Sequence, residues 1–249
     1  MTTCKSSITD GGIPFSYLGP DLDQGPLPAV FYFALSGQES LSLDPYNQPA
    51  VALLNFPMRV FSLTLPGHEP GRLPNESMKA FAKEMEQDNL TIPTFVQKVK
   101  GCLTHLEKNS VLSRDKTGLM GLSRGGFITS HIAANEPTIK YVLQFAPLTK
   151  ISDRDTFKDV LNSSSFNTDT LTDKLYEKTL RIYISNRDHR VGTENAFSFC
   201  QKLVEEAFSH SIRSPQIELI LSAPIGHQGH GTTPKVFEEG ASWLAKQLI

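Results

Sequence analysis

The segment GLSRGG at 121–126 places a serine, Ser123, between glycines directly after the apolar run 118–122. The run predicts a buried strand, and the residues that follow it, to about Asn135, predict a helix. A serine on a strained strand-to-helix turn is exposed at the edge of a sheet, where flanking glycines let the chain pass closely. The helix N-terminus directs free N–H groups at a developing oxyanion. The pattern therefore predicts a nucleophilic serine; the alternative is a serine that only caps the helix.

A hydroxyl nucleophile needs a base, and histidine titrates in the right range for that task. Three of the seven histidines fall within helical patterns, which predicts surface or core positions: His105, His131 and His210. His68 follows a predicted strand and could reach the edge of the site. The segment GHQGHG at 226–231 lies between the last predicted strand and the last predicted helix, and it offers His227 and His230 as bases. No Glu, Asp or Cys stands at ligand spacing from this pair, so no metal site is predicted.

The acid that orients the histidine is expected after a strand that lies between nucleophile and base in the sequence. Asp188 meets this condition, because it follows the apolar run 180–185 within the segment SNRDHRV at 185–191. There its carboxylate can accept the second imidazole N–H and hold the ring. Asp153 or Asp155, one strand earlier, is the reserve. The alternative for Asp188 is an exposed aspartate in a charged turn.

These motifs together resemble the α/β-hydrolase superfamily over nearly the whole chain. The resemblance rests on GLSRGG, the Asp188 turn and the Gly-His loop, together with Ser-Gly at 36–37 and LPGHE at 65–69, each after a predicted strand. The Ser-Arg-Gly-Gly elbow is most similar to the dienelactone-hydrolase and prolyl-oligopeptidase-like branch, here expected without a propeller domain. The resemblance implies a Ser-Asp-His triad in that chain order.

The resemblance also selects between the two histidines. The spacing from His227 to Pro234 is similar to the Gly-His-x-x-His…Pro pattern of many α/β-hydrolases, whose first histidine is catalytic. It therefore implies His227 as the base, with His230 as a helper or a loop residue.

Two backbone N–H groups are implied for the oxyanion hole. The first is that of Arg124, whose side chain either binds an anionic substrate group or pairs with a carboxylate. The second comes from the loop ALSGQE at 34–39, where Gln38 is the predicted donor and Leu35 the alternative. Ser36 replaces the histidine of the common His-Gly form there, and a backbone donor tolerates this change.

The elements that position these residues alternate along the chain. Six apolar runs predict strands buried on both faces: 28–35, 59–65, 118–122, 141–146, 180–185 and 217–221, with 13–18 a weaker antiparallel candidate. Amphipathic helices are predicted near 92–106 and 196–208, and at 234–248 with Thr233 as N-cap. The predicted fold class is α/β, a doubly wound, mostly parallel sheet flanked by helices, with its ligand site at the carboxyl ends of the strands.

Length and composition limit the remaining choices. With 249 residues, 39% of them hydrophobic, the chain is expected to form one domain over 1–249, with possible lid segments at 66–90 and 151–179. A net charge of −2 without a basic stripe argues against nucleic acid as a partner. No signal-peptide core, bilayer-spanning run or disulfide framework is evident, which predicts a cytoplasmic protein.

The functional expectation is a serine hydrolase that cleaves a carboxylic ester or thioester of a small-molecule acyl substrate through an acyl-enzyme, without a cofactor. A peptidase or an acyltransferase would use the same residues. A non-catalytic ligand-binding protein on the hydrolase scaffold is the alternative from another class. A nucleotide enzyme is disfavoured because neither GxGxxG nor GxxxxGK[ST] follows the first strands.

Overall fold

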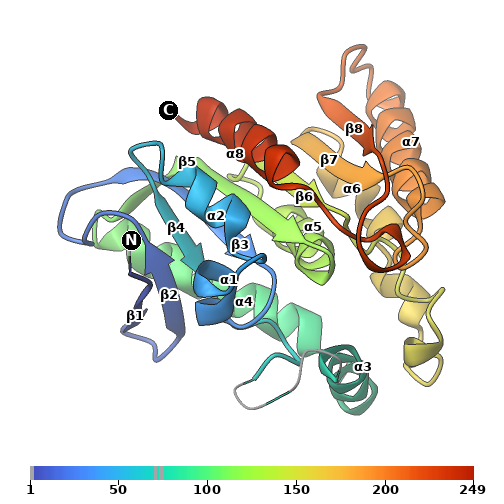
Figure 1. Cartoon of the computed structure of the whole chain (residues 1–249), viewed down its shortest axis with the longest axis horizontal. Coiled ribbons are helices and arrows are strands. Elements are labelled where there is room, and N and C mark those ends of the chain that lie inside the picture. The colour runs from blue at the N-terminus through green and yellow to red at the C-terminus, as the bar shows by residue number, and fades with distance from the viewer. Residues whose placement is uncertain (1–2, 70–71, 73–75) are drawn as a thin grey trace.

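One mostly parallel sheet runs through the molecule. The computed structural model describes residues 3–69, 72 and 76–249, and in these residues eight strands form a sheet in the order β1-β2-β4-β3-β5-β6-β7-β8 (Figure 1). The strands are β1 Lys5–Ile8, β2 Pro14–Leu18, β3 Leu27–Phe33, β4 Arg59–Ser62, β5 Leu112–Leu122, β6 Tyr141–Phe145, β7 Thr179–Ser185 and β8 Ile217–Ser222. β2 pairs antiparallel with β1 and β4, and every neighbouring pair from β4 to β8 is parallel.

Helices cover both faces of this sheet. One face carries α3 Ser77–Gln87, α4 Thr91–Lys108, α5 Arg124–Asn135 and α7 Thr193–Ser209, and the other carries α1 Gly37–Ser42, α2 Gln48–Leu53 and α8 Pro234–Leu248. Figure 1 shows α2 and α8 side by side in front of the strands. Between β6 and β7 lie η1 Asp155–Phe157, η2 Ser163–Phe166, η3 Thr168–Leu171 and α6 Thr172–Leu175, and η4 His227–Gly229 precedes α8. The sheet therefore separates two apolar layers.

The central strand β3 is apolar throughout because both of its faces are covered. In β3, Phe31 stacks on Phe61 of β4 at 5.4 Å between ring centroids, on the face that α4 covers. Tyr32, the next residue, points to the opposite face and packs in the layer formed with α2 and α8. Alternate residues of one continuous apolar run thus contribute to two cores.

The predicted fold class is confirmed. All six predicted strands are present, but β8 lies at the edge of the sheet and none of its residues is buried, so the prediction that it is buried on both faces was wrong. The helices α5 and α8 have the predicted bounds, with Thr233 Oγ1 accepting from the backbone N–H of Val236 at 3.3 Å. Sequence reasoning missed β1, α1, α2, α6 and the short 3-10 helices, each six residues or shorter. Among the described residues, no helix is both long and apolar enough to cross a membrane.

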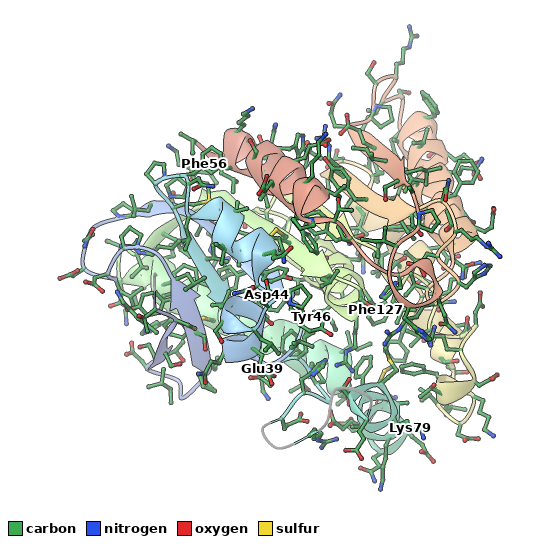
Figure 2. All side chains as sticks on the ribbon, in the orientation of Figure 1. Glu39, Asp44, Tyr46, Phe56, Lys79 and Phe127 are labelled. Carbon is green, nitrogen blue, oxygen red and sulfur yellow. The ribbon has the colours of Figure 1, made fainter. Side chains whose placement is uncertain are left out.

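His131 on α5 is buried, and this predicts acid destabilisation. Its ring lies 4.6 Å from that of Phe127, which Figure 2 labels, and its Nε2 lies 2.9 Å from the carbonyl oxygen of Phe166. Burial lowers the pKa of His131 from 6.5 to about 4, although the hydrogen bond to Phe166 acts in the opposite direction. Below pH 6.5 the unfolded chain therefore binds a proton that the folded chain does not, and stability falls as pH drops to about 4.

The stability contributed by neutral His131 and lost over this range is about 3 kcal/mol. Urea unfolding between pH 7 and pH 4.5 is expected to show this loss in the wild type, and His131→Gln is expected to have a shallower dependence on pH. His210→Gln, at a half-exposed site, is the control and should keep the wild-type slope. An unchanged slope in His131→Gln would contradict the assignment.

Candidate active site

Ser123 occupies a strained turn between β5 and α5. Its φ and ψ are 56° and −114°, a conformation that L-residues rarely adopt. Two of its backbone hydrogen bonds tie it to β6 and the residues that follow: its N–H donates to the carbonyl of Phe145 at 2.8 Å, and its carbonyl accepts from the N–H of Leu148 at 3.0 Å. The serine is therefore fixed at the carboxyl end of the sheet, between β5 and β6.

The glycines beside Ser123 are required by close backbone contacts. A Cβ on Gly121 would lie 2.4 Å from the carbonyl of Gly125, and a Cβ on Gly125 would lie 1.8 Å from the carbonyl oxygen of Phe33. No side chain can move to relieve these contacts, since the obstructing atoms belong to the backbone of the elbow and of β3.

Replacing Gly125 by alanine is expected to destabilise the fold by about 3 kcal/mol or more, because the β5–α5 turn would have to move away from β3. Gly11→Ala is a matched control, since its nearest neighbour, Thr9 Oγ1, would be 3.8 Å away. Thermal melting of both variants provides the comparison. Equal melting temperatures would mean that the elbow is more loosely packed than described.

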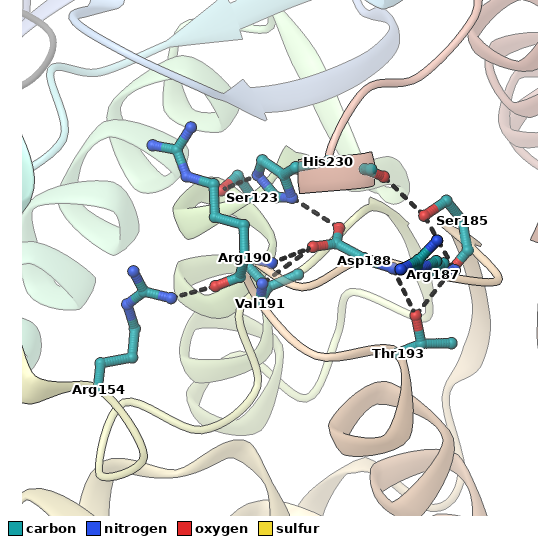
Figure 3. Close-up of polar contacts among 10 residues, drawn as sticks. Ser123, Arg154, Ser185, Arg187, Asp188, Arg190, Val191, Thr193 and His230 are labelled. Carbon is teal, nitrogen blue, oxygen red and sulfur yellow. Dashed lines mark hydrogen bonds and ion pairs between the residues drawn. The ribbon is translucent and has the colours of Figure 1, made fainter. Parts of the chain in front are cut away.

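His230 lies between Ser123 and Asp188. Its Nε2 is 2.9 Å from Ser123 Oγ, and its Nδ1 is 2.7 Å from Asp188 Oδ2 (Figure 3). The three side chains come from the loops that follow β8, β5 and β7 at one edge of the sheet. In this arrangement of hydrogen bonds, one imidazole nitrogen can take the proton of the serine hydroxyl while the carboxylate holds the second imidazole nitrogen.

His227 does not make the contact that was predicted for it. The expected position was wrong: its side chain is exposed, although it lines the same cavity, and the ring that reaches Ser123 belongs to His230. The cause is a tight turn at the surface, in which Gln228 and Gly229 have φ values of 57° and 75°. The turn leaves His227 outside and brings the chain back to the sheet three residues later.

The loop that carries His230 is bonded to the turn that carries Asp188. Ser185 Oγ donates to the carbonyl of Gly229 at 2.6 Å, and the N–H of His189 donates to the carbonyl of Gln228 at 2.9 Å. At Gly229 a Cβ would lie 2.1 Å from the carbonyl oxygen of Arg187, so only glycine fits. These contacts fix the imidazole against the carboxylate.

Asp188 is buried and well supplied with donors. Its Oδ1 accepts from the backbone N–H groups of Arg190 at 2.9 Å and Val191 at 3.0 Å, while Oδ2 faces His230. Burial alone would raise the pKa of Asp188, but the hydrogen bond and charge of His230 and the two N–H groups together hold it below its ordinary value. The reserve candidates do not enter: Asp153 is exposed and accepts from the Asn195 amide at 3.2 Å, and Asp155 is exposed as well.

A cavity of about 590 Å³ opens beside Ser123. Its described lining includes polar groups from several loops, among them Tyr46, His68, Arg124, Arg190 and His227. Of the two predicted lid segments, 66–90 contributes His68, Ser77 and Met78, whereas 151–179 contributes none of the described lining residues. Parts of the first segment, 70–71 and 73–75, lie outside the described residues.

The sequence matches no model of a known protein family and no curated protein. Solved structures match along the whole chain. A cold-adapted esterase from an Arctic intertidal metagenomic library, bound to PEG, has a TM-score of 0.69 and 17% identity, over 99% of this chain and 93% of the other. TT1662 from Thermus thermophilus has a TM-score of 0.71 and 15% identity, over 100% and 98%.

This chain has the α/β-hydrolase fold. The same fold is shared by prolyl oligopeptidase B from Galerina marginata, with a TM-score of 0.68 and 18% identity, over 100% of this chain and 37% of that longer protein. The resemblance predicted from the motifs is thereby confirmed at the level of the fold.

The oxyanion donors predicted for this α/β-hydrolase fold differ in their positions. Arg124 is the first residue of α5, so its backbone N–H has no partner within the helix and lies beside Ser123. Gln38 is exposed on α1 and is not among the described lining residues, so the structure gives no support to it as a donor. Leu35 lines the cavity, but its N–H donates to Ser40 Oγ at 2.9 Å.

Tyr46 is a lining residue that sequence reasoning missed. It lies in the loop between α1 and α2 of the α/β-hydrolase fold, where Figure 2 labels it, and no motif marks it in the sequence. Its phenol carries a hydroxyl that can donate a hydrogen bond.

His68 adds an uncharged imidazole to the same wall. Burial and the nearby charge of Arg124 lower the pKa of His68 to about 3, so it is neutral across the physiological range. Among residues 3–69, 72 and 76–249, no group of three or more His, Cys, Asp or Glu side chains could hold a metal ion.

Proposed function

We propose that this protein is a serine hydrolase that cleaves a carboxylic ester or thioester of a small-molecule acyl substrate, with Ser123 as nucleophile, His230 as general base and Asp188 as the orienting acid. The observation that carries the proposal is the pair of contacts made by one imidazole, 2.9 Å to Ser123 Oγ and 2.7 Å to Asp188 Oδ2. The esterase and the prolyl oligopeptidase that share the fold support hydrolysis as the reaction class.

In the first half of the reaction, His230 Nε2 takes the proton of Ser123 Oγ as the oxygen attacks the carbonyl carbon. The imidazolium that forms is held by Asp188, and it returns the proton to the leaving alcohol or thiol as the C–O or C–S bond breaks. In the second half, His230 takes a proton from water, the hydroxide attacks the acyl-enzyme, and the proton returns to Ser123 Oγ as the acid departs.

The developing oxyanion needs two donors beside Ser123. The N–H of Arg124 supplies the first, at the N-terminus of α5. For the second, we propose the hydroxyl of Tyr46, because Gln38 is exposed and the N–H of Leu35 already donates to Ser40.

Tyr46→Phe is expected to lower kcat about 10²-fold with little change in KM, since the donor acts mainly on the transition state. Tyr176→Phe, which changes a tyrosine that stacks on His210 instead, is the control and should retain wild-type kcat. If kcat of Tyr46→Phe equals that of the wild type, the second donor lies elsewhere.

Labelling with a fluorophosphonate probe tests the proposed function, together with turnover of p-nitrophenyl acetate, butyrate and octanoate. The wild type should be labelled and Ser123→Ala should not, with both proteins showing the same far-UV circular dichroism. A folded wild type that is neither labelled nor active would reject the hydrolase and favour a ligand-binding protein on this scaffold.

Peptide cleavage is the second candidate, because prolyl oligopeptidase B shares the fold. The same residues would serve an amide substrate, with His230 protonating the amine that leaves. Turnover of short aminoacyl anilides at a rate comparable with the esters would favour the peptidase.

A further inference from the structure

The side chain of Arg124 is buried in the wall of the cavity that contains Ser123. It is 3% exposed, its Nη1 donates to the carbonyl of Ser77 at 2.9 Å, and its guanidinium lies 5.1 Å from the ring centroid of Phe81. Within the described part of the chain, its Nε and Nη2 are buried without a hydrogen-bond partner. Two donors of a charged group therefore have almost no accessible surface and no hydrogen-bond partner.

The carboxylates nearest to Arg124 are paired with another residue. Glu69 and Glu84 lie 3.1 Å and 3.4 Å from nitrogens of Arg72, and neither forms an ion pair with Arg124 among the described contacts. Burial lowers the pKa of Arg124 to about 10, which the charges of Glu84 and Glu69 partly oppose. The guanidinium is thus still positive at neutral pH.

A buried cation with unused donors is strongly destabilising unless a partner satisfies it. Nε and Nη2 share one edge of the planar guanidinium, and that edge matches the two oxygens of a carboxylate. The other end of the group is anchored to Ser77, so the free edge is held in place.

The rest of the wall suits an anion. Among the described residues that line the cavity, Arg124 and Arg190 are cations and none is Asp or Glu. His68 is neutral there, so it neither attracts nor repels an anionic group appreciably.

We propose that the free edge of Arg124 binds a carboxylate of the substrate, so that the preferred substrates are esters or thioesters that carry a second, free carboxylate. This inference rests on the proposed hydrolase function and names its substrate class. The residue that follows the nucleophile then has two tasks: its backbone N–H stabilises the oxyanion, and its side chain positions the acid group of the substrate.

The test compares charged and neutral esters of matched size. One pair carries the carboxylate on the acyl part, p-nitrophenyl hemiglutarate against p-nitrophenyl pentanoate; the other carries it on the alcohol part, 4-butyryloxybenzoate against its methyl ester. In at least one pair, kcat/KM of the wild type should favour the charged ester by about 10- to 100-fold. A preference for the neutral ester in both pairs would overturn the proposal.

Variants locate the preference in the guanidinium edge. Arg124→Met should bring the charged-to-neutral ratio close to one, and Arg124→Lys, which keeps the charge but loses the fork, should give an intermediate ratio. Arg190→Met removes the exposed cation of the same wall and should keep most of the preference. A charged-to-neutral ratio that depends on Arg190 and not on Arg124 would overturn the proposal. If Arg124→Met does not fold, the ratio measured for Arg124→Lys decides between the two outcomes.

Binding of glutarate to Ser123→Ala, measured by calorimetry, separates the inference from the hydrolase function. Glutarate should bind at least tenfold more tightly than its dimethyl ester, and the difference should vanish in Ser123→Ala/Arg124→Lys. Ester turnover without this difference in affinity would reject the carboxylate site and support the hydrolase function. Carboxylate binding without ester turnover would support the carboxylate site and reject the hydrolase function.

Discussion

Replacing His230 by alanine is expected to lower kcat for p-nitrophenyl butyrate about 10⁴- to 10⁶-fold, as far as Ser123→Ala does. Among the described residues, His230 is the one whose side chain forms a hydrogen bond with Ser123 Oγ, at 2.9 Å, so its removal leaves no base in place to take the proton. The double variant should be no slower than either single variant, since nucleophile and base act as one unit. Steady-state kinetics on purified protein checks all three.

His227→Ala is the matched control for His230→Ala. His227 lies three residues away in the same loop and lines the same cavity, yet its side chain is exposed. Its removal should change kcat less than about tenfold, because among the described residues it forms no hydrogen bond with Ser123 or Asp188. If His227→Ala were inactive and His230→Ala active, the loop would have to rearrange on substrate binding, and the proposed base would be rejected.

Asp188→Asn is expected to lower kcat about 10⁴-fold with little effect on the fold. An amide can present its NH₂ group to Nδ1 and so favour the wrong tautomer of His230, in which Nε2 carries the proton and cannot accept one from Ser123. The lowered pKa of Asp188 means that the wild-type carboxylate stays charged at neutral pH.

Asp153→Asn gives the comparison for Asp188→Asn, since Asp153 is exposed and was the reserve candidate for the same role. It should retain wild-type kcat. The pH dependence of kcat/KM provides a second readout, because loss of the carboxylate should alter the profile of the imidazole, whereas a purely structural change should lower activity evenly. Equal activity of Asp188→Asn and wild type would exclude the orienting role.

The strands and long helices could be predicted because burial on both faces leaves a continuous apolar run, and burial on one face leaves a helical period. β3 and α5 are examples, the second with its predicted bounds. The four-residue β1, KSSI, has no apolar run because it lies at the edge of the sheet, and α1 and α2 are too short to show a period.

The site could be predicted only as far as single strand ends determine it. Ser123 follows β5 directly and Asp188 lies three residues after the end of β7, so the ends of these strands position them. His230 follows β8 by eight residues, and both histidines of GHQGHG come after a glycine. The choice between them depends on the left-handed turn at 228–229 and on contacts with Arg187, and neither is visible in local sequence. The second oxyanion donor, expected in the loop 34–39, could not be predicted from the sequence for the same reason.

The hydrogen bonds from Ser185 and His189 to the loop of His230 make the acid and the base one mechanical unit. The effect of inserting a residue should therefore depend on where in the loop the residue is added. An added residue between Gln228 and His230 would shift the imidazole out of register with both partners, whereas one near Ala223, which is exposed and precedes the bonded segment, would leave that unit intact. In an engineered variant, the loop could therefore be lengthened at Ala223 while His230 keeps its contacts with Ser123 and Asp188.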